Sequence, residues 1–142
     1  MHLQRKYSER IINWFNKENK ALLITGARQV GKTHLIRHVV KEEIKYNLFE
    51  INLIETPEAV SVISQSETVE DLRIGLSVFS NEKLIPNNTV IFIDEVQKCK
   101  EIITKMKFLA EDNTFKYILS GSLLGVELNN IESAPVGYLE II

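Results

Sequence analysis

The sequence predicts an α/β protein of three layers, with helices on both faces of a mostly parallel sheet. Short, continuous apolar runs alternate along the chain with longer segments in which apolar residues recur at helical spacing. A continuous apolar run is typical of a strand buried on both faces, and neighbouring parallel strands need a helical crossover between them. The length of 142 residues is that of one domain.

Five segments are predicted as strands because each is a short apolar run bounded by polar or turn-forming residues. The first four are clear, and the last resembles the start of a fifth strand. They cover residues 21–25, 47–53, 89–93, 115–119 and 138–142.

The segments between these strands are predicted as helices. Residues 1–20 contain an amphipathic helix that packs on a core of residues 21–142, and we expect that core to be truncated at its C-terminus. Further helices are expected over residues 32–43, 57–64, 69–79 and 101–110.

Two of these helices have recognisable starts. Thr56 is an N-cap candidate, followed by Pro57 at the first helical position and Glu58 in the first turn. Thr68 and Asp71 resemble a capping box in which aspartate replaces the usual glutamate.

Composition favours an ordinary globular domain. The hydrophobic fraction is 44%, the charged fraction is 25%, and the formal net charge of −2 gives no overall attraction to nucleic acid or to an anionic membrane. Apolar runs such as residues 90–93 are too short to span a membrane, and the first ten residues contain no apolar region of the kind found in a signal peptide. The single cysteine, Cys99, fits a reducing compartment, so we expect a cytoplasmic protein.

Residues 26–33 (GARQVGKT) match the phosphate-loop pattern G-x-x-x-x-G-K-[ST] at every fixed position, between a predicted strand and a predicted helix. The two glycines let the backbone turn its N–H groups toward phosphate oxygens, at the positive end of the following helix. Lys32 would reach the β- and γ-phosphates, and the Thr33 hydroxyl would coordinate Mg²⁺. The predicted nucleotide-binding residues are Gly26, Ala27, Arg28, Gln29, Val30, Gly31, Lys32, Thr33 and His34.

Residues 90–95 (VIFIDE) form a second motif, in which a buried strand delivers an acidic pair beside the phosphate loop. Asp94 is predicted to hold the metal together with Thr33, and Glu95 to orient and deprotonate the attacking water. Glu55 is the second candidate for this base. Ser120, at the end of the next strand, is predicted to sense the γ-phosphate or hold the water, although a plain turn of small residues is the open alternative. Glu95, Lys32 and Ser120 are thus the predicted catalytic residues.

Taken together, GARQVGKT, FIDEVQ, ILSGS and APVGYLEII resemble a prokaryotic family of AAA-superfamily ATPases, and the resemblance covers essentially the whole chain. In that family an N-terminal ATPase domain precedes a C-terminal domain of unknown function. The resemblance implies a P-loop NTPase fold with five strands and a central phosphate-loop strand. It also implies ATP hydrolysis linked to a conformational change, with the roles given above for the phosphate loop, Asp94 and Glu95. Gln97 matches the glutamine that follows the acidic pair in the family, without an assigned role.

The sequence therefore predicts an ATPase that uses ATP and Mg²⁺. ATP is favoured over GTP because no guanine-selecting motif follows the phosphate loop. The rival hypothesis is a nucleotide-gated switch with negligible hydrolysis, but such a switch does not need Glu95. A small-molecule kinase would need an arginine-bearing lid, for which the sequence has no signal.

Members of the resembled family continue beyond the position of Ile142 into a helical lid and a C-terminal domain. We therefore expect the chain to be a fragment with weak activity of its own, because an arginine finger or second sensor would be missing. The expected partners are ATP, that C-terminal domain, and a second copy of the chain or another protein.

Overall fold

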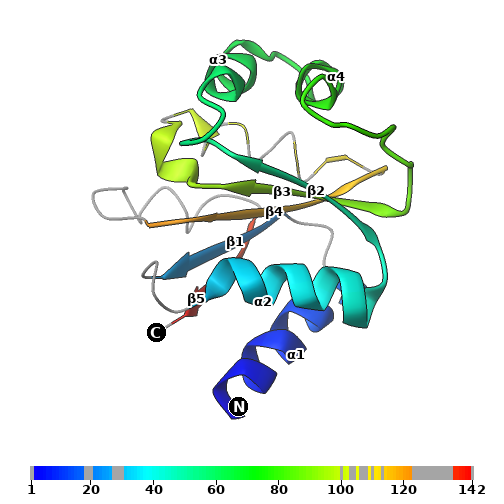
Figure 1. The fold of residues 1–142 in the computed structure, drawn as a ribbon, viewed down its shortest axis with the longest axis vertical. Coiled ribbons are helices and arrows are strands. Elements are labelled where there is room, and N and C mark those ends of the chain that lie inside the picture. The colour runs from blue at the N-terminus through cyan, green and yellow to red at the C-terminus, as the bar shows by residue number, and fades with distance from the viewer. Residues whose placement is uncertain are drawn as a thin grey trace.

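A computed structural model shows the fold (Figure 1) and describes residues 2–17, 21–26, 31–99, 101–102, 105, 109, 111–112, 114–122 and 136–141. The helical elements are α1 (His2–Lys17), α2 (Lys32–His38), the π-helical turn η2 (Val39–Ile44), α3 (Glu58–Gln65), α4 (Val69–Ser77) and the 3-10 turn η3 (Val96–Lys98). The strands are β1 (Ala21–Gly26), β2 (Asn47–Asn52), β3 (Thr89–Asp94), β4 (Lys116–Gly121) and β5 (Val136–Ile141).

The five strands form one sheet in the order β2-β3-β4-β1-β5, and each neighbouring pair is parallel. The predicted parallel α/β fold and the fifth strand near the end of the chain are confirmed. β1, which leads into the phosphate loop, is an interior strand between β4 and β5, while β4 holds the middle place. The phosphate-loop strand is therefore interior, with a neighbour on each side, but it lies one place away from the expected central position.

Helices cover both faces of this sheet, which confirms the three layers. In Figure 1, α1 and α2 lie below the sheet, and α3 and α4 lie above it. Because side chains alternate between the faces of a strand, adjacent residues such as Ile24 and Leu23 enter different cores. Ile24 packs with Ile11 of α1 and Ile36 of α2 in one core. Burying one such side chain contributes about 1.5–3 kcal/mol, so the two cores fix the strands firmly in place.

The register aligns the carboxyl ends of four strands. Asn52 of β2 pairs with Asp94 of β3, Asp94 pairs with Ser120 of β4, and Ser120 pairs with Ile24 of β1. These residues form one row across the sheet. The row is polar at β2, β3 and β4 and apolar at β1, so polar side chains gather at one edge of the sheet.

The helix predicted over residues 32–43 is present, but its second half is a π-helical turn. The backbone N–H of Tyr46 donates to the Val40 carbonyl (3.0 Å), and Lys45 ends the turn in the left-handed conformation with φ of 65°. Apolar periodicity does not distinguish an α-helix from such a wide final turn, since both bury Val39 and Val40.

The two predicted helix starts have different outcomes. The side chain of Thr68 accepts a hydrogen bond from the backbone N–H of Asp71 (3.0 Å), so the predicted cap of α4 is confirmed. The Thr56 prediction is wrong by one residue, because Pro57 is the N-cap of α3 and has no side-chain hydrogen bond to give. Thr56 contributes its backbone carbonyl, which accepts from the N–H of Ala59 (3.1 Å).

The helix predicted over residues 101–110 lies partly outside the described residues. Ile102, Lys105 and Leu109 are helical, and Ile102 and Leu109 are buried in the core beneath α3 and α4. Within the described ranges, no helix is both long and apolar enough to cross a membrane.

Candidate nucleotide-binding site

The phosphate-loop motif begins where β1 ends and finishes where α2 begins. Gly31 is the N-cap of α2 and has φ of 72° and ψ of 27°, a left-handed conformation that favours glycine. A Cβ at Gly31 would meet nothing within 4 Å, so the backbone conformation, not space, requires glycine here. The loop residues Ala27, Arg28, Gln29 and Val30 lie outside the described residues, and their predicted contacts stay predictions.

Lys32 is the first residue of α2 and its side chain turns back toward the end of β1. Its Nζ donates a hydrogen bond to the Gly26 carbonyl (2.8 Å), and the residue is only 5% exposed. A buried ammonium needs polar partners, and this contact joins both ends of the loop. His34, in the same helical turn, is exposed.

Thr33 and Asp94 meet although they are far apart in the sequence. Thr33 Oγ1 donates to Asp94 Oδ2 (3.1 Å), and the backbone N–H of Glu95 donates to Asp94 Oδ1 (2.8 Å). Burial raises the pKa of Asp94, and the hydrogen bonds from Glu95 and Thr33, together with the charge of Lys32, partly oppose that rise. The carboxylate and the hydroxyl that the sequence predicts as metal ligands are therefore brought together.

Glu95 is 8% exposed and follows β3 in a strained conformation. Its φ of 58° and ψ of 44° are left-handed, which costs a non-glycine residue roughly 1–2 kcal/mol. This backbone turns the chain sharply from β3 into η3. Glu95 Oε1 accepts a hydrogen bond from Gln97 Nε2 (3.0 Å), so the carboxylate has a defined direction.

Ser120 lies beside Asp94 in the strand register and is 0% exposed. Among the described residues its Oγ has no hydrogen-bond partner. A buried hydroxyl without a partner is costly, and polar ligands or ordered water commonly satisfy such a group. Ser120 is not among the residues that line the pocket at Asp94, so its predicted contact with the γ-phosphate or the water stays a prediction.

A pocket of about 310 Å³ opens at these residues. Lys32, Thr33, Asp94 and Glu95 line it, so the structure brings together four of the residues that the motifs predict. Two further residues in its lining, Asn52 and Ile54, were not predicted from the sequence. Glu55, the second candidate base, also lines the pocket.

The residues of this pocket fit a magnesium nucleotide. Mg²⁺ prefers oxygen ligands, keeps several waters, and takes one or two protein groups together with the phosphates of its nucleotide. Thr33 and Asp94 supply such oxygens, and no cluster of three or more His, Cys, Asp or Glu side chains is found in the described part of the chain. A site completed by phosphates does not need such a cluster.

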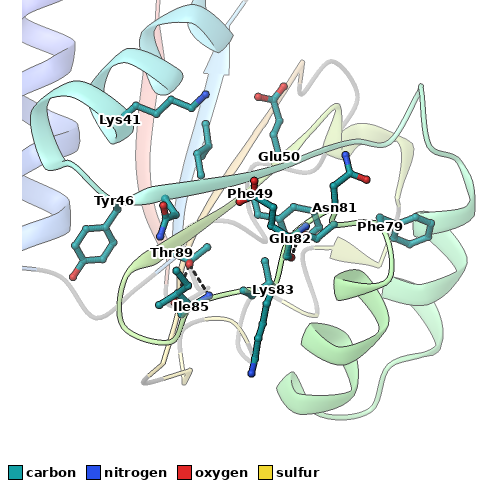
Figure 2. A pocket seen from close by; sticks show the side chains of 14 residues that line it. Lys41, Tyr46, Phe49, Glu50, Phe79, Asn81, Glu82, Lys83, Ile85 and Thr89 are labelled. Atoms are coloured by element: carbon teal, nitrogen blue, oxygen red, sulfur yellow. Dashed lines mark hydrogen bonds between the residues drawn. The ribbon is translucent and has the colours of Figure 1, made fainter.

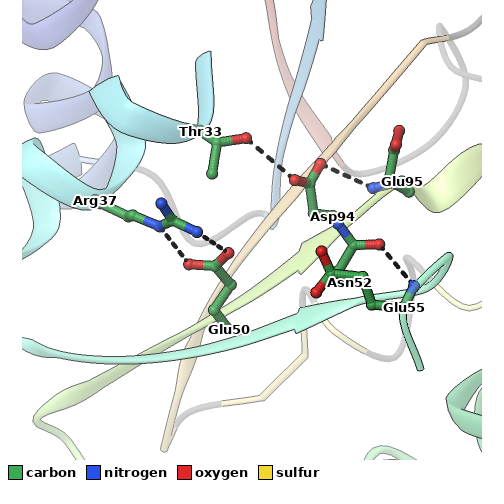
Figure 3. Close-up of polar contacts among 7 residues, drawn as sticks. All are labelled: Thr33, Arg37, Glu50, Asn52, Glu55, Asp94 and Glu95. Carbon is green, nitrogen blue, oxygen red and sulfur yellow. Dashed lines mark hydrogen bonds and ion pairs between the residues drawn. The ribbon is translucent and has the colours of Figure 1, made fainter. Parts of the chain in front are cut away.

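One polar contact beside the pocket was not predicted. Arg37, one turn after Thr33 on α2, makes a bidentate pair with Glu50 of β2, with Nε–Oε1 and Nη2–Oε2 distances of 2.7 Å (Figure 3). Figure 3 shows this pair next to the contact between Thr33 and Asp94. It joins the last turn of α2 to the edge strand of the sheet.

A larger pocket of about 530 Å³ lies elsewhere, along β2 and the segment before β3 (Figure 2). Its lining includes Phe49, Phe79 and Ile85 but none of the predicted phosphate or metal ligands. The candidate site is therefore assigned by its chemistry and not by its size.

A parallel sheet with a strand–loop–helix phosphate motif after β1, and an acidic pair at the end of β3, two strands away, is the arrangement of a P-loop nucleotide-binding domain. The family of AAA domains matches residues 18–142, and the chain belongs to this family. AAA domains are nucleotide-binding, ATPase-type domains.

The solved structures include 249 matching chains. One of them, described as the structure of C. elegans PCH-2, has a TM-score of 0.51 and 16% sequence identity over 98% of this chain. The chain spans only 40% of the length of that protein, and the similarity shows a shared fold alone. No curated protein matches the chain.

Proposed function

We propose that this AAA domain binds ATP with Mg²⁺ and hydrolyses the ATP, and that hydrolysis drives a conformational change in the protein to which it belongs. The observation that carries the proposal is the contact between Thr33 and Asp94, which are 61 positions apart in the sequence. It assembles the two metal-ligand candidates at the start of α2, in the pocket that Lys32 and Glu95 also line.

Each residue of the pocket has a distinct role in the proposed reaction. Lys32 neutralises phosphate charge, while Thr33 and Asp94 hold the metal. Glu95 takes the proton of a water that attacks the γ-phosphorus, as the bond to the β-phosphate breaks and ADP leaves. Ser120 donates to a γ-phosphate oxygen or to that water. When bound, Mg²⁺ supplies positive charge against the developing negative charge.

The phosphate loop itself completes the proposal. Gly26 and Gly31 stand at its two ends. The backbone N–H groups between them are proposed to donate to the phosphates, at Ala27, Arg28, Gln29 and Val30. His34, which is exposed in the first turn of α2, is proposed only as a neighbour of the nucleotide.

Binding and turnover are tested together. Calorimetry with a non-hydrolysable ATP analogue, with and without Mg²⁺, measures affinity, and phosphate release measures hydrolysis. Mg²⁺-dependent binding followed by phosphate release supports the proposal. Binding without any release would favour the nucleotide-gated switch, and no binding would contradict both.

Nucleotide choice and partners extend this proposal. ATP should bind more tightly than GTP, and competition of GTP against a bound ATP analogue measures the difference. A C-terminal domain of the same protein, a second copy of the chain or another protein is the proposed receiver of the conformational change.

A further inference from the structure

Gln97 joins the ends of two neighbouring strands at the pocket. Its Nε2 donates to Glu95 Oε1 (3.0 Å), and its Oε1 accepts from the backbone N–H of Ser122 (3.2 Å). Glu95 directly follows β3, and Ser122 directly follows β4. We infer that Gln97 is a positioning residue, which fixes the direction of the Glu95 carboxylate by tying it to the end of β4. This inference rests on the proposed function of Glu95 as the base.

The two bonds require an amide at this position. A carboxylate could accept from Ser122 but has no proton to donate to Glu95, and a lysine could donate but not accept. Turning the amide over would set its oxygen against the Glu95 carboxylate and its NH₂ group against the Ser122 N–H. Only one orientation therefore satisfies both neighbours.

The backbone on both sides is shaped to accept this amide. The left-handed conformation of Glu95 reverses the chain, which brings a residue two positions later back within reach of the Glu95 side chain. A Cβ at Gly121 would lie 2.3 Å from Gln97 Oε1 and 3.1 Å from the Val96 backbone nitrogen. The absence of a side chain at Gly121 thus leaves the space in which the amide sits.

Fixing the carboxylate matters because a glutamate side chain is flexible. A base that samples several rotamers must be ordered before it can take a proton, and a displacement of about 1 Å can cost about 10²-fold in rate. The bond from Gln97 orders Glu95 in advance. Substrate binding does not depend on it, because Gln97 is not among the residues that line the pocket.

Two substitutions separate the two bonds. Gln97→Glu can keep the acceptor for Ser122 but loses the donor to Glu95, whereas Gln97→Ala loses both. Both variants should lower kcat by roughly 10- to 100-fold, with KM and the affinity for an ATP analogue unchanged. The matched controls are Gln65→Glu and Gln65→Ala, because Gln65 is an exposed glutamine at the end of α3. A Gln97→Glu variant with wild-type kcat would overturn the inference.

A double-mutant cycle tests whether Gln97 acts through Glu95. In a Glu95→Gln background, adding Gln97→Ala should cause no further loss of phosphate release, since residues that act as a unit are not additive. Full additivity in this cycle would show that Gln97 supports the fold and does not position the base.

A readout without hydrolysis separates this inference from the proposed function. If the wild type binds Mg²⁺ and ATP but releases no phosphate, the proposed function fails. NMR then tests separately whether Gln97 makes its hydrogen bonds to Glu95 and Ser122. The Gln97 side-chain amide signals should move in Glu95→Ala, and the Ser122 backbone N–H signal should move in Gln97→Ala. Unchanged signals in both variants would overturn the positioning role.

Discussion

Lys32 is a buried cation at the junction of β1 and α2, and its chemistry makes it the residue on which phosphate binding should depend most. Lys32→Ala should weaken binding of an ATP analogue by about 1.5–3 kcal/mol, roughly ten- to a hundredfold, because hydrogen bonds to charged groups fall in that range. Calorimetry measures the affinity, and circular dichroism checks the fold. Lys41→Ala is the matched control, since Lys41 is exposed on η2. Equal losses in the two variants would contradict a specific role for Lys32.

The buried carboxylate of Asp94 is expected to lower the free energy of unfolding of the nucleotide-free chain. Its pKa is raised, mainly by burial, so the folded chain holds this proton more tightly than the unfolded chain does. The resulting stabilisation is present below the unfolded-state pKa and is lost as the pH rises through the folded-state pKa. At pH 7 the ionised carboxylate therefore opposes folding, and Asp94→Asn should make the nucleotide-free chain more stable.

Urea unfolding at pH 7 and at about pH 4, near the ordinary pKa of aspartate, measures this effect. The advantage of Asp94→Asn should shrink at the lower pH, and the variant should lose the Mg²⁺ dependence of nucleotide binding. Glu67→Gln, at an exposed position, controls for the loss of one negative charge. If Asp94→Asn is less stable than the wild type at pH 7, the ionised Asp94 carboxylate does not oppose folding.

At the scale of elements, the Thr68 cap is independent of the site. Its hydrogen bond to the Asp71 N–H satisfies one donor at the start of α4. Thr68→Ala should lower the free energy of unfolding by about 1 kcal/mol, within a typical range of about 0.5–2, while nucleotide affinity stays unchanged. Thr68→Ser should retain most of the stability because serine is also a good N-cap. Urea denaturation compares the free energy of unfolding of the wild type and the two variants. An unchanged free energy of unfolding in Thr68→Ala would show that the cap does not stabilise α4.

The elements also show what the sequence could predict. Strands and their order along the chain follow from continuous apolar runs, and the phosphate loop and acidic pair follow from local spacing. Contacts that depend on register could not be predicted in the same way. The place of Asn52 beside Asp94, and the pair between Arg37 and Glu50, become visible only when β2 is known to be the edge strand next to β3.

Gln97 illustrates the same limit at the site. The sequence places it two residues after Glu95, but its second partner, Ser122, is 25 positions later and meets it only through the pairing of β3 with β4. The available signal was the position of Gln97 between Val96 and Cys99, both of which are buried, because a half-buried amide needs hydrogen-bond partners. The thiol of Cys99 itself is buried, and burial raises its pKa, which makes the thiol less reactive.

In the whole molecule, the sheet brings the phosphate loop and the acidic pair together at the carboxyl ends of its strands. The proposed function is that the site formed there hydrolyses ATP with Glu95 as the base. The most direct test measures nucleotide binding and phosphate release for the wild type, Glu95→Gln and the exposed control Glu42→Gln. Glu95→Gln should bind Mg²⁺ and ATP as the wild type does, while phosphate release falls by about 10²–10⁴-fold, the usual loss for a positioned base. Glu42→Gln should match the wild type in both. Phosphate release at the wild-type rate in Glu95→Gln would contradict the claim and direct the search for the base to Glu55.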